Sequence, residues 1–174
     1  MEKKTDLRIV KTKRAIKETF LEMRKTLPLE KIRVRDICER ALINKSTFYS
    51  HYSDAFALSD EMEDEAIAAL LEKLTCKGCL FSDPERFLSE MPAVFDGNMD
   101  LLLPLFRDRM DVAFQKIKTS LQNFYTYDGI TPSEDIRLNF VIGGTFHAMR
   151  ELKFQKHYED EVLAKEISEM IAKI

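Results

Sequence analysis

Apolar side chains recur at helical spacing along most of the chain. From about Asp6 to Lys25 they fall three, four or seven residues apart, which is typical of one face of a helix. Pro28 ends this element because it disfavours helical backbone at the residue before it. The same spacing predicts a short helix over 34–40. Another short helix is expected to start at Asn44, whose side chain suits an N-cap.

The remaining pattern is also helical. Asp83-Pro84 indicates a helix start, since proline is tolerated in the first turn. Pro104 is expected to kink or break a long helix that carries Phe106 near its start and reaches Phe124. The other predicted helices span 53–74, 133–156 and 159–173, and the predicted loops span 75–83, 96–98 and 128–132. With eight or nine helices and no convincing strand, the fold class is all-α.

Composition supports this fold class. The chain has 174 residues, of which 45% are hydrophobic and 33% are charged, so it is able to form a core. Five Gly and five Pro supply few turn signals, which argues against a β-sandwich or barrel. No apolar run approaches the roughly 18–20 residues of a membrane span, and no apolar segment follows the basic N-terminus as in a secretory signal. Three cysteines predict no disulfide framework, which fits a cytoplasmic location.

Charge is distributed unevenly. The net charge is −3, but residues 1–52 sum to +7 and residues 53–174 to −10. A basic N-terminal third is typical of a nucleic-acid-binding head, although a solvated charged helix surface gives the same count. We predict a DNA-binding domain over 1–53 and a second helical domain over 54–174.

The basic third contains the pattern of a helix-turn-helix, with two short helices joined by a tight turn. The second helix must present short polar side chains to the major groove, since large ones would hold it away from the bases. Lys45, Ser46 and Thr47 meet that requirement. Phe48 is expected to point inward as an anchor, and Tyr49 is able to reach the DNA backbone.

These residues resemble the DNA-binding domain of the TetR/AcrR family of bacterial transcriptional regulators. The matching stretches are KRAIKETF (13–20), IRVRDICERA (32–41) and NKSTFYSHY (44–52). The last is the most specific, because a small polar pair precedes an aromatic doublet and a His-Tyr pair. The resemblance covers about 50 residues, and the rest of the chain agrees in being helical.

The resemblance implies DNA contacts at defined positions. Arg35 would read bases, and Tyr49 and His51 would hold phosphates. The alternative for each is a solvated surface residue, and His51 could instead pack beside Tyr52. The full predicted DNA-binding set is Arg33, Arg35, Lys45, Ser46, Thr47, Tyr49 and His51.

The sequence departs from the family pattern at three positions. Arg33 stands where many members have a capping Thr, and Ala55 where many have a Lys that contacts the backbone. Leu42 stands where many have Gly. A left-handed turn there would cost Leu about 1 kcal/mol.

The C-terminal part predicts a dimer. Residues 140–146 are apolar or small on every face, and such a helix must be buried on every face. One face could meet the chain's own core and another a second subunit, with Gly143-Gly144 allowing close approach. An ordinary monomeric core helix is the alternative. The predicted interface comprises Phe140, Gly143, Gly144, His147, Ile167, Met170 and Ile171.

Phenylalanines and methionines in the same part could line an adaptable apolar pocket, as the resemblance implies for a small-molecule effector. The same residues could simply form a core. The predicted lining is Phe95, Met99, Phe106, Met110, Phe114 and Phe146. A protein partner could take the place of the small effector.

Other chemistry is poorly represented. Cys76-Lys77-Gly78-Cys79 is a single C-x-x-C without the further ligands that zinc needs, so we expect chance loop cysteines, with redox sensing as the alternative. No catalytic motif occurs, and we predict no enzyme activity, metal or cofactor.

The sequence therefore predicts a sequence-specific double-stranded DNA-binding regulator. It would be a homodimeric repressor on a palindromic operator, released by a small effector. The alternative is a helical adaptor whose body binds a protein.

Overall fold

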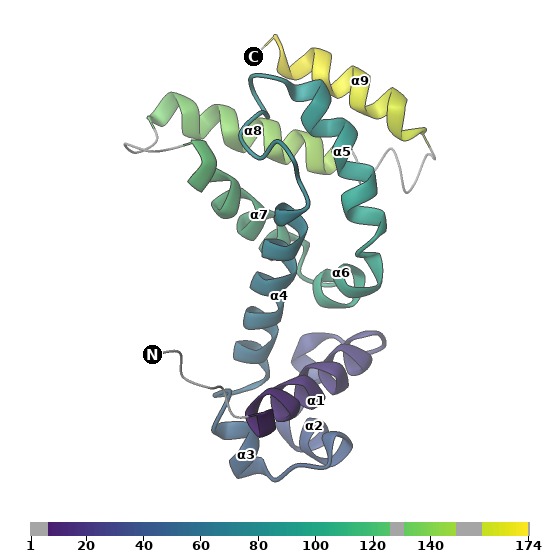
Figure 1. The fold of residues 1–174 in the computed structure, drawn as a ribbon, viewed down its shortest axis with the longest axis vertical. Coiled ribbons are helices and arrows are strands. Elements are labelled where there is room, and N and C mark those ends of the chain that lie inside the picture. Colours follow the sequence, from purple (N-terminus) through teal and green to yellow (C-terminus); the bar gives the residue numbers. More distant parts are fainter. Residues whose placement is uncertain (1–6, 126–130, 149–157, 174) are drawn as a thin grey trace. The chain divides into compact units, whose positions relative to one another are not determined.

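The computed structural model describes residues 7–125, 131–148 and 158–173. Within these ranges the chain forms α-helices and one short 3-10 helix, with no strand (Figure 1). The predicted all-α class is confirmed. None of the helices in these ranges combines the length and the hydrophobicity needed to cross a bilayer.

The chain divides into two compact units. Unit 1 comprises Met1–Ala66 and Asp100–Arg109, and unit 2 comprises Ile67–Met99 and Met110–Ile174. Helix α4 (Ala55–Glu72) begins in unit 1 and ends in unit 2.

Unit 1 contains the predicted three-helix head. Its elements are α1 (Leu7–Arg24), the 3-10 helix η1 (Leu29–Lys31), α2 (Val34–Ala41), α3 (Lys45–Tyr49), the start of α4, and α6 (Met99–Phe106). Its core is formed by Ile16, Phe20, Met23, Ile37, Phe48 and Leu58, which are fully or almost fully buried. The apolar stripe predicted for the first helix is therefore inward-facing over most of its length, whereas Ile9 near its start is exposed.

The predicted long helix through Phe106 and Phe124 is wrong. Two helices occupy this stretch, α6 and α7 (Met110–Tyr125), and the break lies at Arg107–Arg109 rather than at Pro104, which is inside α6. The side chains at the break explain it, because each one binds unit 1. Arg107 donates to the Lys25 carbonyl oxygen at 3.2 Å, and Arg109 pairs with the buried Glu63 at 2.9 Å.

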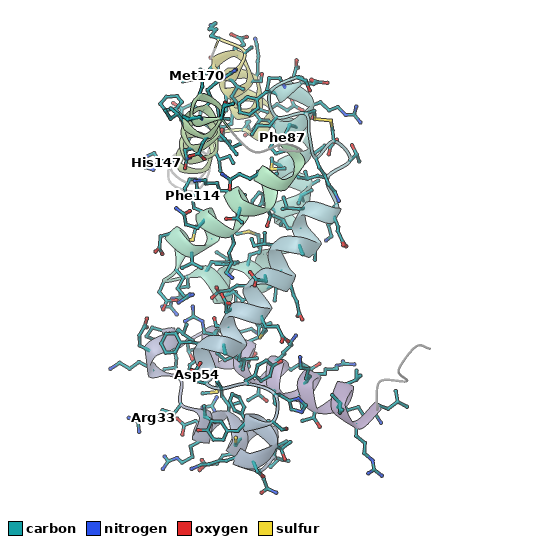
Figure 2. The ribbon with its side chains drawn as sticks, turned by 90° about the vertical axis from the view of Figure 1, so that its left-hand side faces the viewer. Arg33, Asp54, Phe87, Phe114, His147 and Met170 are labelled. Carbon is teal, nitrogen blue, oxygen red and sulfur yellow. A yellow bond between two sulfur atoms is a disulfide. The ribbon has the colours of Figure 1, made fainter. Side chains whose placement is uncertain are left out.

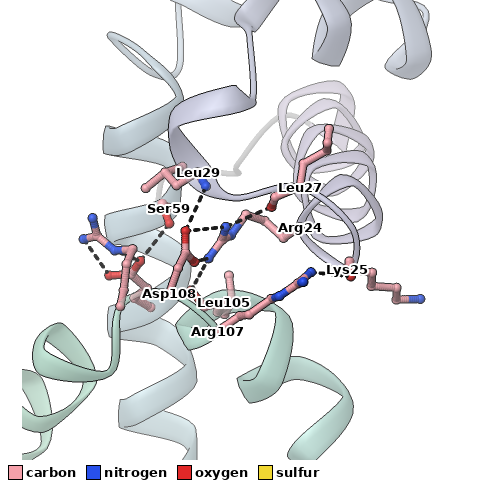
Figure 3. A network of polar contacts seen from close by, with 10 residues as sticks. Arg24, Lys25, Leu27, Leu29, Ser59, Leu105, Arg107 and Asp108 are labelled. Atoms are coloured by element: carbon pink, nitrogen blue, oxygen red, sulfur yellow. Dashed lines mark hydrogen bonds and ion pairs between the residues drawn. The ribbon is translucent and has the colours of Figure 1, made fainter.

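Asp108, in the same break, forms an ion pair with Arg24 at the end of α1 (Figure 3). The Arg24 side chain has no exposed surface, and its guanidinium also donates to the carbonyl oxygens of Leu27 at 3.0 Å and Leu105 at 2.9 Å. Asp108 in turn accepts from the Leu29 N–H at 3.2 Å. The hydrogen bond from Arg24 lowers the pKa of Asp108. This network joins α1, η1 and α6 within unit 1.

The turn of the helix-turn-helix is strained at Leu42. This residue ends α2 with φ 55° and ψ 44°, in the left-handed region, and its side chain is 91% exposed. Its N–H and that of Ile43 both donate to the Cys38 carbonyl oxygen, which closes the helix end. The turn thus keeps the geometry that favours glycine, although a leucine occupies it.

We expect Leu42→Gly to raise the free energy of unfolding by about 1 kcal/mol. Glycine adopts left-handed backbone without the steric cost that leucine has, and the exposed leucine side chain contributes no buried surface that would be lost. For a chain of this length the melting temperature should rise by roughly 2–4 °C. Thermal unfolding followed by circular dichroism measures this. Leu42→Ala is the matched control, since it removes the exposed side chain but keeps Cβ. A melting temperature that falls in Leu42→Gly would contradict the assignment of strain.

Unit 2 contains α5 (Pro84–Asp96), α7, α8 (Pro132–Ala148) and α9 (Asp160–Ile171). As predicted, α5 begins at Asp83-Pro84, and the Asp83 side chain caps it by accepting from the Arg86 N–H. Helix α5 packs on α9, and α7 packs on α8. The predicted helix over 133–156 is seen as far as Ala148, and its remainder lies outside the described residues.

Candidate nucleic-acid-binding site

Helix α3 is short and firmly seated. Phe48 is completely buried, as predicted, and its N–H donates to the Asn44 carbonyl oxygen at 3.2 Å. Asn44 occupies the N-cap position, but its side chain makes no capping hydrogen bond. Phe48 faces the core, whereas Lys45, Ser46 and Tyr49 of the same helix are exposed and Thr47 is half-buried.

Two aromatic residues frame Phe48. Tyr49 meets the Phe48 ring edge-on at 5.7 Å and is still 56% exposed, so its ring is fixed while its hydroxyl is accessible. Tyr52 is buried, with its ring 5.7 Å from that of Phe48. His51 is half-buried, and its ring lies 6.3 Å from Tyr52.

The two predicted arginines lie at the start of α2. Arg33 is exposed at the N-cap position and makes no capping bond, as expected for a side chain without an acceptor. Arg35 is exposed and lies 3.5 Å from carboxylate oxygens of Asp36 and Glu39. Exposed pairs of this kind contribute at most about 1 kcal/mol, so Arg35 can exchange them for another anion.

A charged cluster between α1 and α4 holds the end of the helix-turn-helix. The Glu61 carboxylate forms ion pairs with the ammonium groups of Lys17 at 2.7 Å and Lys13 at 3.1 Å. It also accepts a hydrogen bond from the Tyr52 hydroxyl at 3.0 Å. Lys17 also pairs with Glu65 at 2.6 Å. Burial and the hydrogen bond to Glu61 raise the pKa of Tyr52. Two of the basic residues counted in the head are therefore neutralised inside unit 1. Sequence reasoning missed this cluster because Lys13 is 48 residues from Glu61 and Lys17 is 48 residues from Glu65.

The cluster predicts acid sensitivity. Burial raises the pKa of Glu61, but hydrogen bonds from Lys17, Lys13 and Tyr52 outweigh that effect and lower the pKa to about 2 from the ordinary 4.5. The stabilisation is complete above about pH 4.5 and is lost as pH falls towards about 2. We expect the melting temperature of Glu61→Gln to lie below that of wild type at neutral pH and to converge with it in acid. Glu30→Gln, at an exposed carboxylate in η1, is the control. A gap that stays constant with pH would contradict the assignment.

The predicted interface residues in unit 2 fall into two groups. Phe140 is 65% exposed, Met170 is 62% exposed, and His147 and Gly144 are exposed. Figure 2 shows His147 and Met170 directed away from the ribbon. Ile167 and Ile171, in contrast, are buried within the same chain.

The two adjacent glycines of α8 have different surroundings. A Cβ on Gly143 would lie 3.7 Å from the Phe114 ring, whereas one on Gly144 would have no neighbour within 4 Å. Gly143 therefore faces α7, and Gly144 faces solvent. Two exposed apolar residues on α8 and near α9 were missed, Ile136 and Tyr158, because their neighbours are polar and break the apolar pattern.

The predicted pocket residues are distributed over both units. Phe106 is buried in unit 1. Phe95, Met99, Met110 and Phe114 are half-buried in unit 2. The side chain of Phe146 lies outside the described residues.

The two cysteines of the C-x-x-C, expected to be chance loop cysteines, are bonded to each other. Cys76 and Cys79 form a disulfide, because the chain turns at Lys77-Gly78 and brings the two Cα atoms to 5.5 Å. Cys38 is a free, buried thiol in α2, and burial raises its pKa. In the described part of the chain no group of His, Cys, Asp and Glu side chains is arranged to hold a metal ion.

No protein-family model matches the chain. Over 87 residues, 49% of its length, the chain is 30% identical to the uncharacterized HTH-type transcriptional regulator YxbF of Bacillus subtilis strain 168. The match covers 22% of that protein, so the chain spans about a fifth of the relative's length.

Proposed function

We propose that the chain is a sequence-specific regulator of transcription that binds double-stranded DNA through α3. The observation that carries this proposal is the arrangement of α3, in which Phe48 is buried and Lys45, Ser46 and Tyr49 are exposed on the same short helix. The similarity to a helix-turn-helix regulator from B. subtilis supports it. The sequence resemblance points further, to the TetR/AcrR family.

Each exposed group on α3 has a distinct part in this proposal. Lys45 supplies a positive charge for a phosphate or a guanine edge, and the small Ser46 and Thr47 side chains allow the helix to approach the bases. The Tyr49 hydroxyl donates to a phosphate oxygen. Arg33 and Arg35 extend the cationic surface to the start of α2. None of these side chains belongs to the Glu61 cluster, in which Glu61 pairs with Lys13 and Lys17.

A single short recognition helix reads few base pairs, so we propose a homodimer on a palindromic operator. The exposed apolar side chains of unit 2 support a surface for self-association, with Phe140 on α8 and Met170 on α9. Gly144 would let a partner helix approach closely. Ile167 and Ile171 would support this surface from within, because they lie on the buried face of α9.

The regulatory step is proposed as a shift between two populations. A small apolar effector that binds the DNA-incompetent arrangement more tightly would release the operator, which makes the protein a repressor. To move the protein from almost entirely DNA-competent to almost entirely DNA-incompetent, the effector must bind the second state more tightly than the first by about 5.5 kcal/mol.

Selection of bound sequences from a random duplex pool tests the proposal. We expect a palindromic site, with binding that weakens steeply as salt increases. Absence of any enriched duplex at physiological salt would contradict DNA recognition. A chain that enriches no duplex but retains a protein on its unit 2 surface would instead favour the adaptor function.

A further inference from the structure

The loop between α4 and α5 is closed by the Cys76–Cys79 disulfide, drawn as a sulfur–sulfur bond in Figure 2. These four residues form a β-turn, in which the Cys79 N–H donates to the Cys76 carbonyl oxygen. The Cα–Cα distance of 5.5 Å lies within the range of roughly 4.4–6.8 Å found in disulfides. The β-turn therefore has the backbone spacing that a disulfide between these two residues requires.

The two sulfur atoms differ in access. Cys76 is half-buried, whereas Cys79 is buried, as are the neighbouring residues Leu74 and Leu80. An external reagent therefore reaches Cys76 first, and Cys79 is placed to react with it from inside.

The reaction requires a small-molecule disulfide, RSSR. The Cys76 thiolate attacks one sulfur of RSSR, which forms a mixed disulfide and releases the first RS⁻. The Cys79 thiolate then attacks the Cys76 sulfur, forms the Cys76–Cys79 bond and releases the second RS⁻. The two cysteine protons pass to the released thiolates. The cysteine pair is oxidised by two electrons and RSSR is reduced to two RSH, and excess RSH reverses the exchange.

The turn is connected to the helices that carry the proposed self-association surface. At the N-cap of α5, the Asp83 N–H donates to the Cys79 carbonyl oxygen at 2.8 Å, and within α5 Glu90 accepts from the Thr75 N–H at 2.7 Å. Helix α5 packs on α9. On α8, the Arg137 guanidinium lies 5.2 Å from the Phe81 ring centroid. Restraint at the turn is thereby passed to α5, α8 and α9, all within unit 2.

We propose that Cys76 and Cys79 form a reversible thiol–disulfide switch that responds to small-molecule disulfides and controls self-association through α8 and α9. The disulfide limits the conformations of the turn and holds α5 and α8 in one arrangement, so the oxidised chain associates more tightly. The control of association rests on the proposed dimer, whereas the exchange chemistry does not.

Peptide mapping tests the chemistry on the full wild-type chain. The chain is reduced with dithiothreitol, exposed to oxidised glutathione, quenched by alkylation and digested with trypsin. Cleavage after Lys73, Lys77 and Arg86 leaves the cysteines on separate peptides, 74–77 and 78–86. We expect these two peptides to be joined after oxidation and separate after renewed reduction. The peptide 36–40 carries the buried Cys38 and serves as the internal control. It should be recovered in its alkylated form, without a glutathione adduct, after each treatment.

Sedimentation equilibrium of the oxidised and reduced chain tests the coupling. We expect the dimer dissociation constant to rise by at least about fivefold on reduction, the lower end of usual coupling between sites. Both states are wild type, so the comparison does not depend on whether a variant folds. Cys76→Ser should behave as the reduced chain and should not respond to oxidised glutathione.

The outcomes separate the two proposals. Stable glutathione adducts without a joined pair of peptides overturn the switch. A dimer whose dissociation constant is equal or smaller after reduction overturns the control of association alone. A chain that is monomeric in both states overturns this control together with the proposed dimer. A redox-responsive dimer that enriches no duplex overturns DNA recognition and leaves the switch intact.

Discussion

Asp108→Ala is expected to lower the free energy of unfolding by about 3 kcal/mol, the lower end of the effect of breaking a buried ion pair. The change leaves the Arg24 guanidinium, which has no exposed surface, without its carboxylate, and it removes the acceptor of the Leu29 N–H. The lower end applies because the Asp108 side chain is 26% exposed and water can partly replace it. Urea denaturation followed by circular dichroism measures the loss. It would be a large fraction of the roughly 5–15 kcal/mol that stabilises a typical domain.

Two further variants separate the ion pair from a general effect of removing charge. Asp111→Ala removes an exposed carboxylate at the start of α7 and should cost less than about 1 kcal/mol. Arg24→Met combined with Asp108→Ala should regain part of the loss, because no buried charge is then left unpaired. If the double variant is less stable than Asp108→Ala, the account of the network is wrong, since the single variant would not contain a costly orphaned cation.

Lys45→Ala is expected to weaken binding to the selected operator by about 1–3 kcal/mol per half-site, which a dimer experiences twice. Lys45 is an exposed residue in the first turn of α3, where the proposed DNA contact forms. If Lys45 contacts a phosphate, the slope of log affinity against log salt should also fall by about 1 per subunit. Fluorescence anisotropy over a series of salt concentrations measures both quantities.

Lys31→Ala is the matched control, because it removes one exposed lysine from η1, which precedes the helix-turn-helix. Its effect on affinity should be small. Equal losses for Lys31→Ala and Lys45→Ala would indicate diffuse electrostatic attraction and contradict a specific contact through α3. Tyr49→Phe distinguishes the hydroxyl from the ring, since the ring still packs edge-on against Phe48.

The helical elements of the head could be predicted because their signals are local. The spacing of Ile16, Phe20 and Met23 identifies the buried face of α1, and Phe48 is an aromatic residue within a polar stretch. The strained Leu42 could also be anticipated, since the tight turn after α2 requires left-handed backbone whatever residue occupies it. The break between α6 and α7 could not. Its cause lies in the partners of Arg107, Asp108 and Arg109, which are distant in sequence.

The candidate site was predicted only in part for the same reason. The exposed positions of α3 follow from one buried residue and helical geometry. The partners of Lys13 and Lys17 come from α4, and only tertiary packing shows that these lysines are neutralised by Glu61. The buried positions of Ile167 and Ile171 depend on packing against α5, which the apolar pattern of α9 alone does not specify.

The sequence by itself determined the helical fold class, the helix-turn-helix and the basic character of its segment. Each of these depends on residues within a few turns of one another. Only the tertiary structure decided that Asp108 completes the head by pairing with Arg24, 84 residues away. It also decided that Glu61 neutralises two lysines and that the turn at Cys76–Cys79 is connected to α5 and α8. The physical reason is that ion pairing and burial depend on distance in space, and local hydrophobic periodicity fixes that distance only along one element.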